Sequence, residues 1–399
     1  MNSGLEALHP YPFERLADLF SDVKVMALDR IALTIGEPRH PAPEAVFDIL
    51  SQATHSLSQY PTTLGRPELR EVISRWLCAR FQLPHVDPAT QVLPLNGTRE
   101  GLFSVAQALV SAGRPGAVVC PNPFYQIYEG AAYLAGTQPV FVNCPSSLGF
   151  LPDFESVTSA QWQSCQLLYL CSPGNPSGAV LPTDTLKSLI ELAHRYDFVI
   201  ASDECYSEIY RDESNPPVGL LQASQGMGNK DFSRCLCFHS LSKRSSLPGL
   251  RSGFVAGEAD LVARFARYRT YHGCAMPVHH QLVSEWAWSD EEHVRVNRAL
   301  YRAKFEAVTP ILADVMAVPE PEAGFYLWPE TPIEDPAFAV AVLRETGVAV
   351  LPGSYLARPT AQGNPGANRI RIALVAELSE CVEAAERIAK AVRCGFSGR

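Results

Sequence analysis

Lys243 lies just after an apolar, strand-like run, in the segment HSLSKRSSLPGLRSG. Ser240 and Ser242 precede it, and Arg251 follows it within the same segment. Hydroxyl groups and a guanidinium suit a phosphate dianion, and a nearby amine can form an imine with an aldehyde. A phosphate, an aldehyde and a lysine together describe pyridoxal 5′-phosphate, which this grouping predicts as the cofactor. A lone lysine at such a place would more simply be a solvated surface charge.

Two further strand-like runs end in polar residues that the same cofactor could use. Asp203 follows FVIAS, and a carboxylate facing a pyridine nitrogen keeps that nitrogen protonated, so that the ring withdraws electrons. Tyr206 can reach the phenolic oxygen of the ring, and so can Asn175 in the loop SPGNPSG after QLLYLC. Each residue also has a simpler interpretation, because Asp-x-x-Tyr can cap a helix and Asn-Pro-Ser-Gly can be only a turn.

Gly97, Thr98 and Arg99 stand where a strand-like run turns into a helical one. Backbone N–H groups at a helix N-terminus bind phosphate, although an ordinary helix start explains the pattern equally well. Tyr125, in PNPFYQIY, could stack on a pyridine ring or could pack in the core. Arg371, in NRIRIAL, could bind an α-carboxylate through two parallel hydrogen bonds, and Arg369 on the same strand face competes for that role.

These residues need an α/β sheet to bring them together. Apolar runs at 91–95, 117–120, 166–171, 198–202, 235–239 and 253–256 predict strands, and they alternate with helical patterns such as 186–196. Ligands of such sheets bind beyond the carboxyl ends of the strands. After about residue 290 the pattern predicts a long helix, short strands near 324–328, 348–351 and 369–374, and a terminal helix at 379–392.

This change of pattern predicts a division into domains. We expect an N-terminal arm with part of a small domain at 1–50, a large cofactor-binding domain at 51–289, and a small C-terminal domain at 290–399. At 399 residues, the chain is long enough for such a division.

Composition narrows the range of partners. The net charge of −9 argues against a nucleic-acid partner, and no apolar run reaches membrane-spanning length. The start MNSGLEALHPYPFERL does not read as a secretory signal, so a cytoplasmic location is expected. The eleven cysteines are irregularly spaced and the histidines lack metal-ligand spacing. We therefore expect reduced thiols and no metal.

The motifs, from Ile35-Gly36-Glu37-Pro38 to Arg371, resemble the class I/II aminotransferases of fold type I. The resemblance implies a large domain with a mainly parallel central sheet flanked by helices, and a smaller α/β domain. It implies Lys243 as the lysine bonded to pyridoxal phosphate, Asp203 at the pyridine nitrogen, and Asn175 and Tyr206 at the phenolic oxygen. The remaining cofactor contacts that it implies are Tyr125 over the ring and Gly97, Thr98, Arg99, Ser240, Ser242 and Arg251 at the phosphate.

The resemblance also bears on substrates and assembly. It implies amino-acid and keto-acid substrates, bound by Arg371, Asn175 and Gly36, and a homodimer in which Tyr60 reaches the neighbouring subunit's phosphate. Within the family, LHPYPFERL, LPGSYLAR and NPGANRIRIALV resemble N-succinyldiaminopimelate aminotransferases of bacterial lysine biosynthesis. Glutamate and N-succinyl-2-amino-6-oxopimelate are then the expected reactants, with Arg39, Arg269 and His272 as candidates for their distal anions.

Three alternatives share most of these residues. The first is a general aspartate- or alanine-type aminotransferase, and the second is a pyridoxal-phosphate C–S lyase, which would release pyruvate and ammonia from cystathionine. The third is a cofactor-sensing transcription regulator, which would need a DNA-binding domain ahead of residue 35.

Overall fold

The computed structural model describes residues 3–25, 29–111, 113 and 116–396, and at its centre is a seven-stranded sheet. The strands lie in the order β2-β8-β7-β6-β5-β3-β4. Neighbouring strands are parallel except for β8, which is antiparallel to both β2 and β7. Their bounds are β2 Val92–Leu95, β3 Ala117–Asn122, β4 Gln138–Asn143, β5 Cys165–Cys171, β6 Val199–Asp203, β7 Cys235–Ser240 and β8 Gly253–Gly257.

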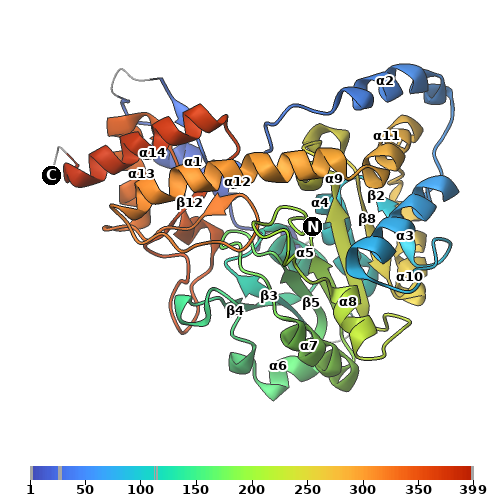
Figure 1. The fold of residues 1–399 in the computed structure, drawn as a ribbon. Helices are drawn as coiled ribbons and strands as arrows, with labels where there is room; N and C mark the ends of the chain where they lie inside the picture. The colour runs from blue at the N-terminus through green and yellow to red at the C-terminus, as the bar shows by residue number, and fades with distance from the viewer. Residues whose placement is uncertain (1–2, 26–28, 112, 114–115, 397–399) are drawn as a thin grey trace.

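Helices cover both faces of this sheet, which is why its strands read as continuous apolar runs (Figure 1). On one face pack α4 (Thr98–Leu109), α5 (Ile127–Leu134) and α10 (Ala259–His272). On the other lie α3 (Pro67–Phe81), α7 (Thr183–Tyr196), α8 (Leu220–Gly226) and α11 (Val278–Ser289). Side chains alternate between the two cores, so that Ile200 of β6 enters one and Ala201 the other. The mainly parallel sheet flanked by helices is confirmed.

The six strands predicted from apolar runs are all present, each within two residues of its predicted ends. The sequence prediction lacked β4, an edge strand in which only Val142 is buried. A strand without a buried run gives little hydrophobic signal. The predicted strand at 348–351 is instead two short strands, β10 (Val348–Ala349) and β11 (Leu351–Pro352), which pair with different neighbours.

A separate core is built mainly from the C-terminal part of the chain. It packs α12 (Glu292–Ala313), α13 (Asp335–Thr346) and α14 (Leu378–Arg393) around β10, β12 (Ile370–Ala373) and β9 (Tyr326–Leu327). The N-terminal strand β1 (Ile31–Ala32) pairs with β10, whereas Val46 of α2 (Glu44–Gln52) packs in the large core. The boundaries at 50/51 and 289/290 stay a prediction.

The long helix α12 extends from the α11 end of the large sheet to the C-terminal helices α13 and α14 (Figure 1). Its buried residues recur along one side as Val294, Asn297, Arg298, Tyr301, Lys304, Phe305, Val308 and Leu312. The polar members of this side lie between Asn297 and Lys304, and the part beyond Lys304 is apolar. This helix therefore connects the edge of the large sheet to the C-terminal core.

Candidate active site

The carboxyl edge of the central sheet gathers most of the predicted site residues. Asp203 ends β6, Asn175 follows β5, and Lys243 lies in α9 (Leu241–Arg244), directly after β7. Because β8 runs the other way, Arg251 reaches the same edge by preceding its strand. They surround a cavity of about 500 Å³, together with Gly36, Thr98, Arg99, Tyr125, Tyr206, Ser240, Ser242 and Arg371.

Lys243 supplies the amine of this cavity. Its Nζ donates to the carbonyl oxygen of Gly36 at 2.5 Å and lies 5.3 Å from the centre of the Phe325 ring. Burial lowers the pKa of Lys243 to about 8, because a desolvated ammonium is disfavoured. An amine with this pKa can take up and release a proton near neutral pH.

Asp203 is 4% exposed at the end of β6. Its Oδ2 accepts from the Tyr128 hydroxyl at 2.7 Å, and its Oδ1 accepts from the Cys205 backbone N–H at 3.3 Å. Burial raises the pKa of Asp203, which the hydrogen bonds from Cys205 and Tyr128 only partly offset. Sequence reasoning missed Tyr128, although it lies in the same PNPFYQIY segment as Tyr125.

Tyr206 faces a second tyrosine that the sequence did not single out. The hydroxyls of Tyr206 and Tyr326 lie 3.0 Å apart, and both residues line the cavity. A Cβ atom on Gly36 would lie 1.8 Å from the Tyr326 hydroxyl. Any other residue at position 36 would therefore clash with this ring in its present place. The lack of a side chain thus lets the Gly36 carbonyl approach Lys243.

Arg371, rather than Arg369, faces the cavity. Its Nη1 donates to Asn175 Oδ1 at 3.1 Å and its Nη2 to the Thr34 carbonyl at 2.7 Å, whereas Nε is buried without a partner among the described residues. Arg369 turns to the Trp328 carbonyl and to Glu330, which pairs with it across a β-bridge. Of the two arginines, only Arg371 lines the cavity.

The opposite end of the cavity is rich in donors for an anion. Gly97 has φ +82° and precedes the first turn of α4, and a Cβ there would lie 2.4 Å from Arg251 Nη2. Thr98 Oγ1 is 3.0 Å from Cys205 Sγ, and Ser240 Oγ accepts from the Ser242 backbone N–H at 3.1 Å. Helix N–H groups, hydroxyls and a guanidinium together suit a phosphate.

The N-terminal segment also contributes to the cavity, which the sequence did not predict. Tyr11 and Phe13 line it beside Tyr125, and the Arg99 guanidinium lies 5.4 Å from the centre of the Tyr11 ring. Arg99 has no ion pair among the described residues. Its positive charge therefore remains available to a ligand.

The three candidates for distal anions lie elsewhere. Arg269 is fully buried, where it pairs with Glu100 and donates to the Cys274 carbonyl at 3.0 Å. His272 stacks on Tyr268 and borders a neighbouring cavity, and Arg39 does not line the central one. The Arg269 nomination is wrong for this chain, since its guanidinium is already neutralised by a carboxylate.

Tyr60 stands apart from the cavity. Its side chain is fully exposed on the single chain, at 102%. The predicted contact with a neighbouring subunit stays a prediction. Within the described part of the chain, no helix is long and apolar enough to cross a membrane. In the same residues, no group of three or more His, Cys, Asp and Glu could hold a metal ion.

One observation tests whether pyridoxal phosphate fits, and a second tests whether an amino-acid substrate fits beside it. The buried carboxylate of Asp203 forms no ion pair with any described residue, and a protonated pyridine nitrogen would supply the missing positive charge. The buried, unpartnered Nε of Arg371 is a donor for a carboxylate. An amine, an acid and an anion-binding end thus share one cavity, and the fit is good.

The chain matches known proteins over nearly its whole length. An LL-diaminopimelate aminotransferase of Nitratidesulfovibrio vulgaris is 31% identical over 96% of this chain and 97% of its own. The structure of an aminotransferase from Neisseria meningitidis superposes with a TM-score of 0.95 at 48% identity, covering 98% of this chain and 100% of that one. A probable N-succinyldiaminopimelate aminotransferase from Thermus thermophilus gives a TM-score of 0.84 at 27% identity over 95% of this chain and 100% of that one.

The family assignment rests on a match to a family model. Residues 29–388 match the family described as Aminotransferase class I and II. This stretch contains all the residues of the cavity except Tyr11 and Phe13. The chain therefore belongs to the class I and II aminotransferases, which use pyridoxal 5′-phosphate to exchange amino groups between amino acids and keto-acids.

Proposed function

We propose that the chain exchanges an amino group between glutamate and N-succinyl-2-amino-6-oxopimelate, on the route to diaminopimelate and lysine. The whole-length likeness to an LL-diaminopimelate aminotransferase supports a diaminopimelate skeleton. The likeness to a probable N-succinyldiaminopimelate aminotransferase supports the acylated form.

The observation that carries the proposal is that a second guanidinium lines the cavity beside that of Arg371. Arg371 binds the carboxylate next to the reacting carbon through its guanidinium, whose Nε has no partner among the described residues. Arg99 lines the same cavity with no ion pair of its own among the described residues. A substrate with a second carboxylate at a distance satisfies both cations, which a monocarboxylic amino acid does not.

The reaction follows from the groups around the amine. When bound, pyridoxal phosphate supplies an aldehyde that bonds to amines and a ring that withdraws electrons from the substrate's Cα. Lys243 Nζ would hold that aldehyde in the absence of substrate, and once freed it would carry a proton between the substrate's Cα and the former aldehyde carbon. Asp203 keeps the ring nitrogen protonated, while Tyr128 holds the carboxylate in place. Asn175 and Tyr206 orient the ring through its phenolic oxygen.

We also propose the homodimer as the working unit, with Tyr60 at the neighbouring subunit's phosphate. Its full exposure leaves this side chain free for such a contact. A mixture of Tyr60→Ala and Lys243→Ala chains should then regain activity, because each hybrid dimer has one intact site. Ultracentrifugation provides the control, and a fully active monomer would rule out shared sites.

The substrate test is a panel of acceptors with glutamate as the common donor. The succinylated keto-acid should give the highest kcat/KM, above oxaloacetate and pyruvate. LL-diaminopimelate with 2-oxoglutarate tests the unacylated route in the reverse direction. Equal kcat/KM for LL-diaminopimelate and for the succinylated keto-acid would show that the enzyme does not require the succinyl group. A preference for oxaloacetate would replace the diaminopimelate assignment with a general aspartate aminotransferase.

Arg99→Gln adds a test of the second cation. Losing one exposed charge contact should lower kcat/KM for the succinylated keto-acid by about tenfold, and for pyruvate by much less. Because Arg99 also stands near the phosphate end, the cofactor dissociation constant is measured alongside. An equal loss of kcat/KM on both acceptors, with weaker cofactor binding, would show that Arg99 binds the cofactor phosphate rather than the substrate.

A further inference from the structure

Behind Lys243 lies a buried chain of three polar side chains that the mechanism above does not use. His40 Nε2 is 2.7 Å from Lys304 Nζ, and His40 Nδ1 is 2.7 Å from Asn297 Oδ1. All three residues are buried: His40 is 8% exposed, Lys304 is 2% exposed and Asn297 is 6% exposed. His40 follows the segment of Gly36, and its two partners lie on the polar side of α12.

With Lys304 charged, hydrogen-bond chemistry fixes the protons on these three side chains. Asn297 Nδ2 donates to the backbone carbonyls of Lys243 at 3.1 Å and of Arg244 at 3.0 Å. Since carbonyls only accept, the amide nitrogen must face them, and Oδ1 is left to face His40. Nδ1 of His40 must then carry the proton, and Nε2 accepts from the Lys304 ammonium, which can only donate. His40 is therefore neutral.

The chain ties together two segments that meet at the reacting amine. Ser246 Oγ donates to the His40 carbonyl at 2.9 Å, so His40 binds the lysine loop through its backbone as well as through its ring. On the other side of the cavity wall, Lys243 Nζ donates to the carbonyl of Gly36. His40 thus fixes the distance between the backbone that bears Gly36 and the backbone that bears Lys243.

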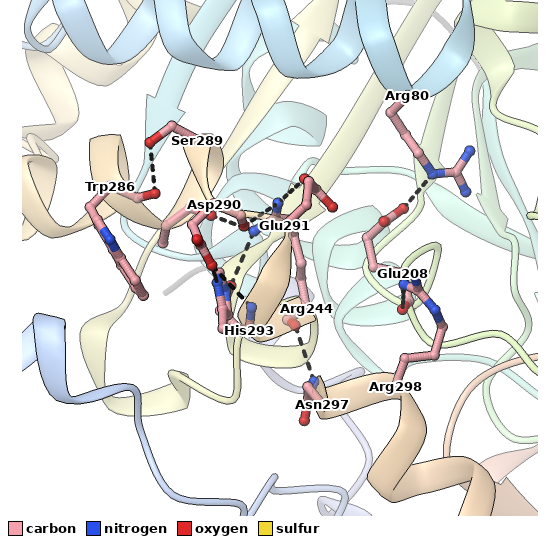
Figure 2. Close-up of polar contacts among 12 residues, drawn as sticks. Arg80, Glu208, Arg244, Trp286, Ser289, Asp290, Glu291, His293, Asn297 and Arg298 are labelled. Atoms are coloured by element: carbon pink, nitrogen blue, oxygen red, sulfur yellow. Dashed lines mark hydrogen bonds and ion pairs between the residues drawn. The ribbon is translucent and has the colours of Figure 1, made fainter. Parts of the chain in front are cut away.

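The end of α9 has little freedom to adjust by itself. Arg244 is 1% exposed and lies beside the Trp76 and Trp288 rings, where it donates to the Ala287 carbonyl at 2.5 Å and pairs with Glu291. Figure 2 shows Arg244 directed at the α11–α12 junction, with Asn297 reaching back to its carbonyl. The α9 end is therefore held against α12, so a change at Asn297 reaches Lys243.

A proton on His40 would break the arrangement. Nε2–H would point at the Lys304 ammonium, and two cations would face each other without water. Burial, opposed by the Asn297 hydrogen bond and assisted by the Lys304 charge, lowers the pKa of His40. Burial also lowers the pKa of Lys304. The other groups acting on this pair are Glu377, Glu380, Cys381 and Arg39, and the Tyr301 ring lies 4.4 Å from the imidazole.

We propose that His40, held as the neutral Nδ1–H tautomer between Lys304 and Asn297, is a positioning residue that keeps the Gly36 carbonyl on the Lys243 amine. The proposal rests on the role given above to Lys243. The proposed role requires a hydrogen-bond donor and a hydrogen-bond acceptor in the side chain at position 40. It does not require that this side chain titrate. It also requires that the lysine at position 304 be charged.

The test uses three substitutions with a matched control. Gln at position 40 offers one donor and one acceptor and does not titrate, whereas Phe offers neither, so H40Q and H40F separate the two requirements. Lys304→Met removes the donor and leaves His40 free to accept a proton. His85→Gln is the control, because His85 is exposed and does not line the cavity.

The primary readout is the reactivity of Lys243 in cofactor-free protein, by competitive amine labelling and peptide mapping across pH. Wild type should show a midpoint near pH 8. H40F should move the midpoint to lower pH, because the ammonium loses its carbonyl acceptor, and should lower kcat of the holoenzyme about tenfold or more. H40Q and H85Q should keep the wild-type midpoint, and H40Q should recover most of kcat.

Two further readouts guard against a misfolded H40F. K304M should introduce a fall in kcat as pH drops through the ordinary histidine range, and H40Q should not show that fall. In protein with ¹⁵N-labelled histidine, the signal lost in H40Q should be a neutral Nδ1–H imidazole at pH 7. An Nε2–H tautomer, or an H40F labelling midpoint equal to that of wild type, would overturn the proposal.

The outcomes also separate this proposal from the proposed function. A substrate other than the succinylated keto-acid changes the acceptor panel and leaves the labelling midpoints untouched. A cofactor lysine other than Lys243 would show itself in wild type, since borohydride reduction of the holoenzyme would place the label elsewhere. Neither result depends on residue 40.

Discussion

The two sides of Lys243 differ in how their residues come together. On the cofactor side, Asp203 ends one strand of the sheet and Asn175 and Lys243 follow its two neighbours, so the order of these parallel strands brings all three to a common edge. On the α12 side, His40 meets partners 257 and 264 residues away along the chain. The first arrangement follows from a regular scaffold, and the second depends on how two cores are placed against each other. The residues that contact the reactants lie on the cofactor side, and the residue proposed to position the Lys243 amine lies on the α12 side.

The largest expected effect comes from the amine shared by both sides. Lys243→Ala should remove transamination, and loss of proton transfer alone accounts for about 10²- to 10⁴-fold in kcat. The phosphate end is unchanged, so the variant should still bind the cofactor. Borohydride reduction of wild type followed by peptide mapping checks the assignment, and a label on another lysine would contradict it.

Arg371 and Arg369 form a matched pair from one strand segment. Arg371→Ala should weaken both half-reactions by about 2–5 kcal/mol, since it leaves a substrate carboxylate desolvated and unpaired. Arg369→Ala should change neither half-reaction appreciably, because its guanidinium turns to Trp328 and Glu330. Single-turnover measurements with glutamate and with the keto-acid test each half separately. Comparable losses in the two variants would show that the α-carboxylate is bound elsewhere.

Substitutions of Asp203 and Tyr128 test the cofactor side, first at the carboxylate and then at the hydroxyl that donates to it. Asp203→Ala should cost about 3 kcal/mol of transition-state stabilisation, which is typical for one preorganised electrostatic contact. Tyr128→Phe keeps the stacked ring on Tyr169 and removes only the hydroxyl, so about 1 kcal/mol is expected. Values of kcat are compared at saturating cofactor. Near-normal turnover of Asp203→Ala with cofactor fully bound would exclude its role at the ring nitrogen.

The smallest effect concerns stability on the α12 side. The pKa of His40 is lowered from its ordinary value of 6.5, so at lower pH the unfolded chain binds a proton that the folded chain refuses. Stability from this group is therefore complete above pH 6.5 and is lost as pH falls from there toward the folded-state pKa. Thermal unfolding of wild type and H40Q between pH 5 and 8 checks this, with H85Q as control. Parallel curves for wild type and H40Q would show that residue 40 is not linked to folding in this range.

The contrast explains what the sequence could and could not foretell. Six strands and the edge residues Asn175, Asp203 and Lys243 followed from apolar runs and from where polar residues ended them. Tyr128 and Tyr326 were not foreseen, because an aromatic residue inside an element is usually core packing and nothing local marks its hydroxyl. Arg269 was misassigned because the sequence does not reveal that Glu100 neutralises it.

The helix α12 has a consequence that concerns insertions and deletions rather than substitutions. Each residue of an α-helix turns its successor by about 100°. Asn297, Tyr301 and Lys304 share a side only because of their spacing, so removing one exposed residue between Asn297 and Lys304 would rotate the lysine away from His40. The apolar residues beyond it would turn with it, away from the C-terminal core. The length of this stretch is therefore expected to tolerate no single-residue change, even where the identities of its exposed residues vary freely.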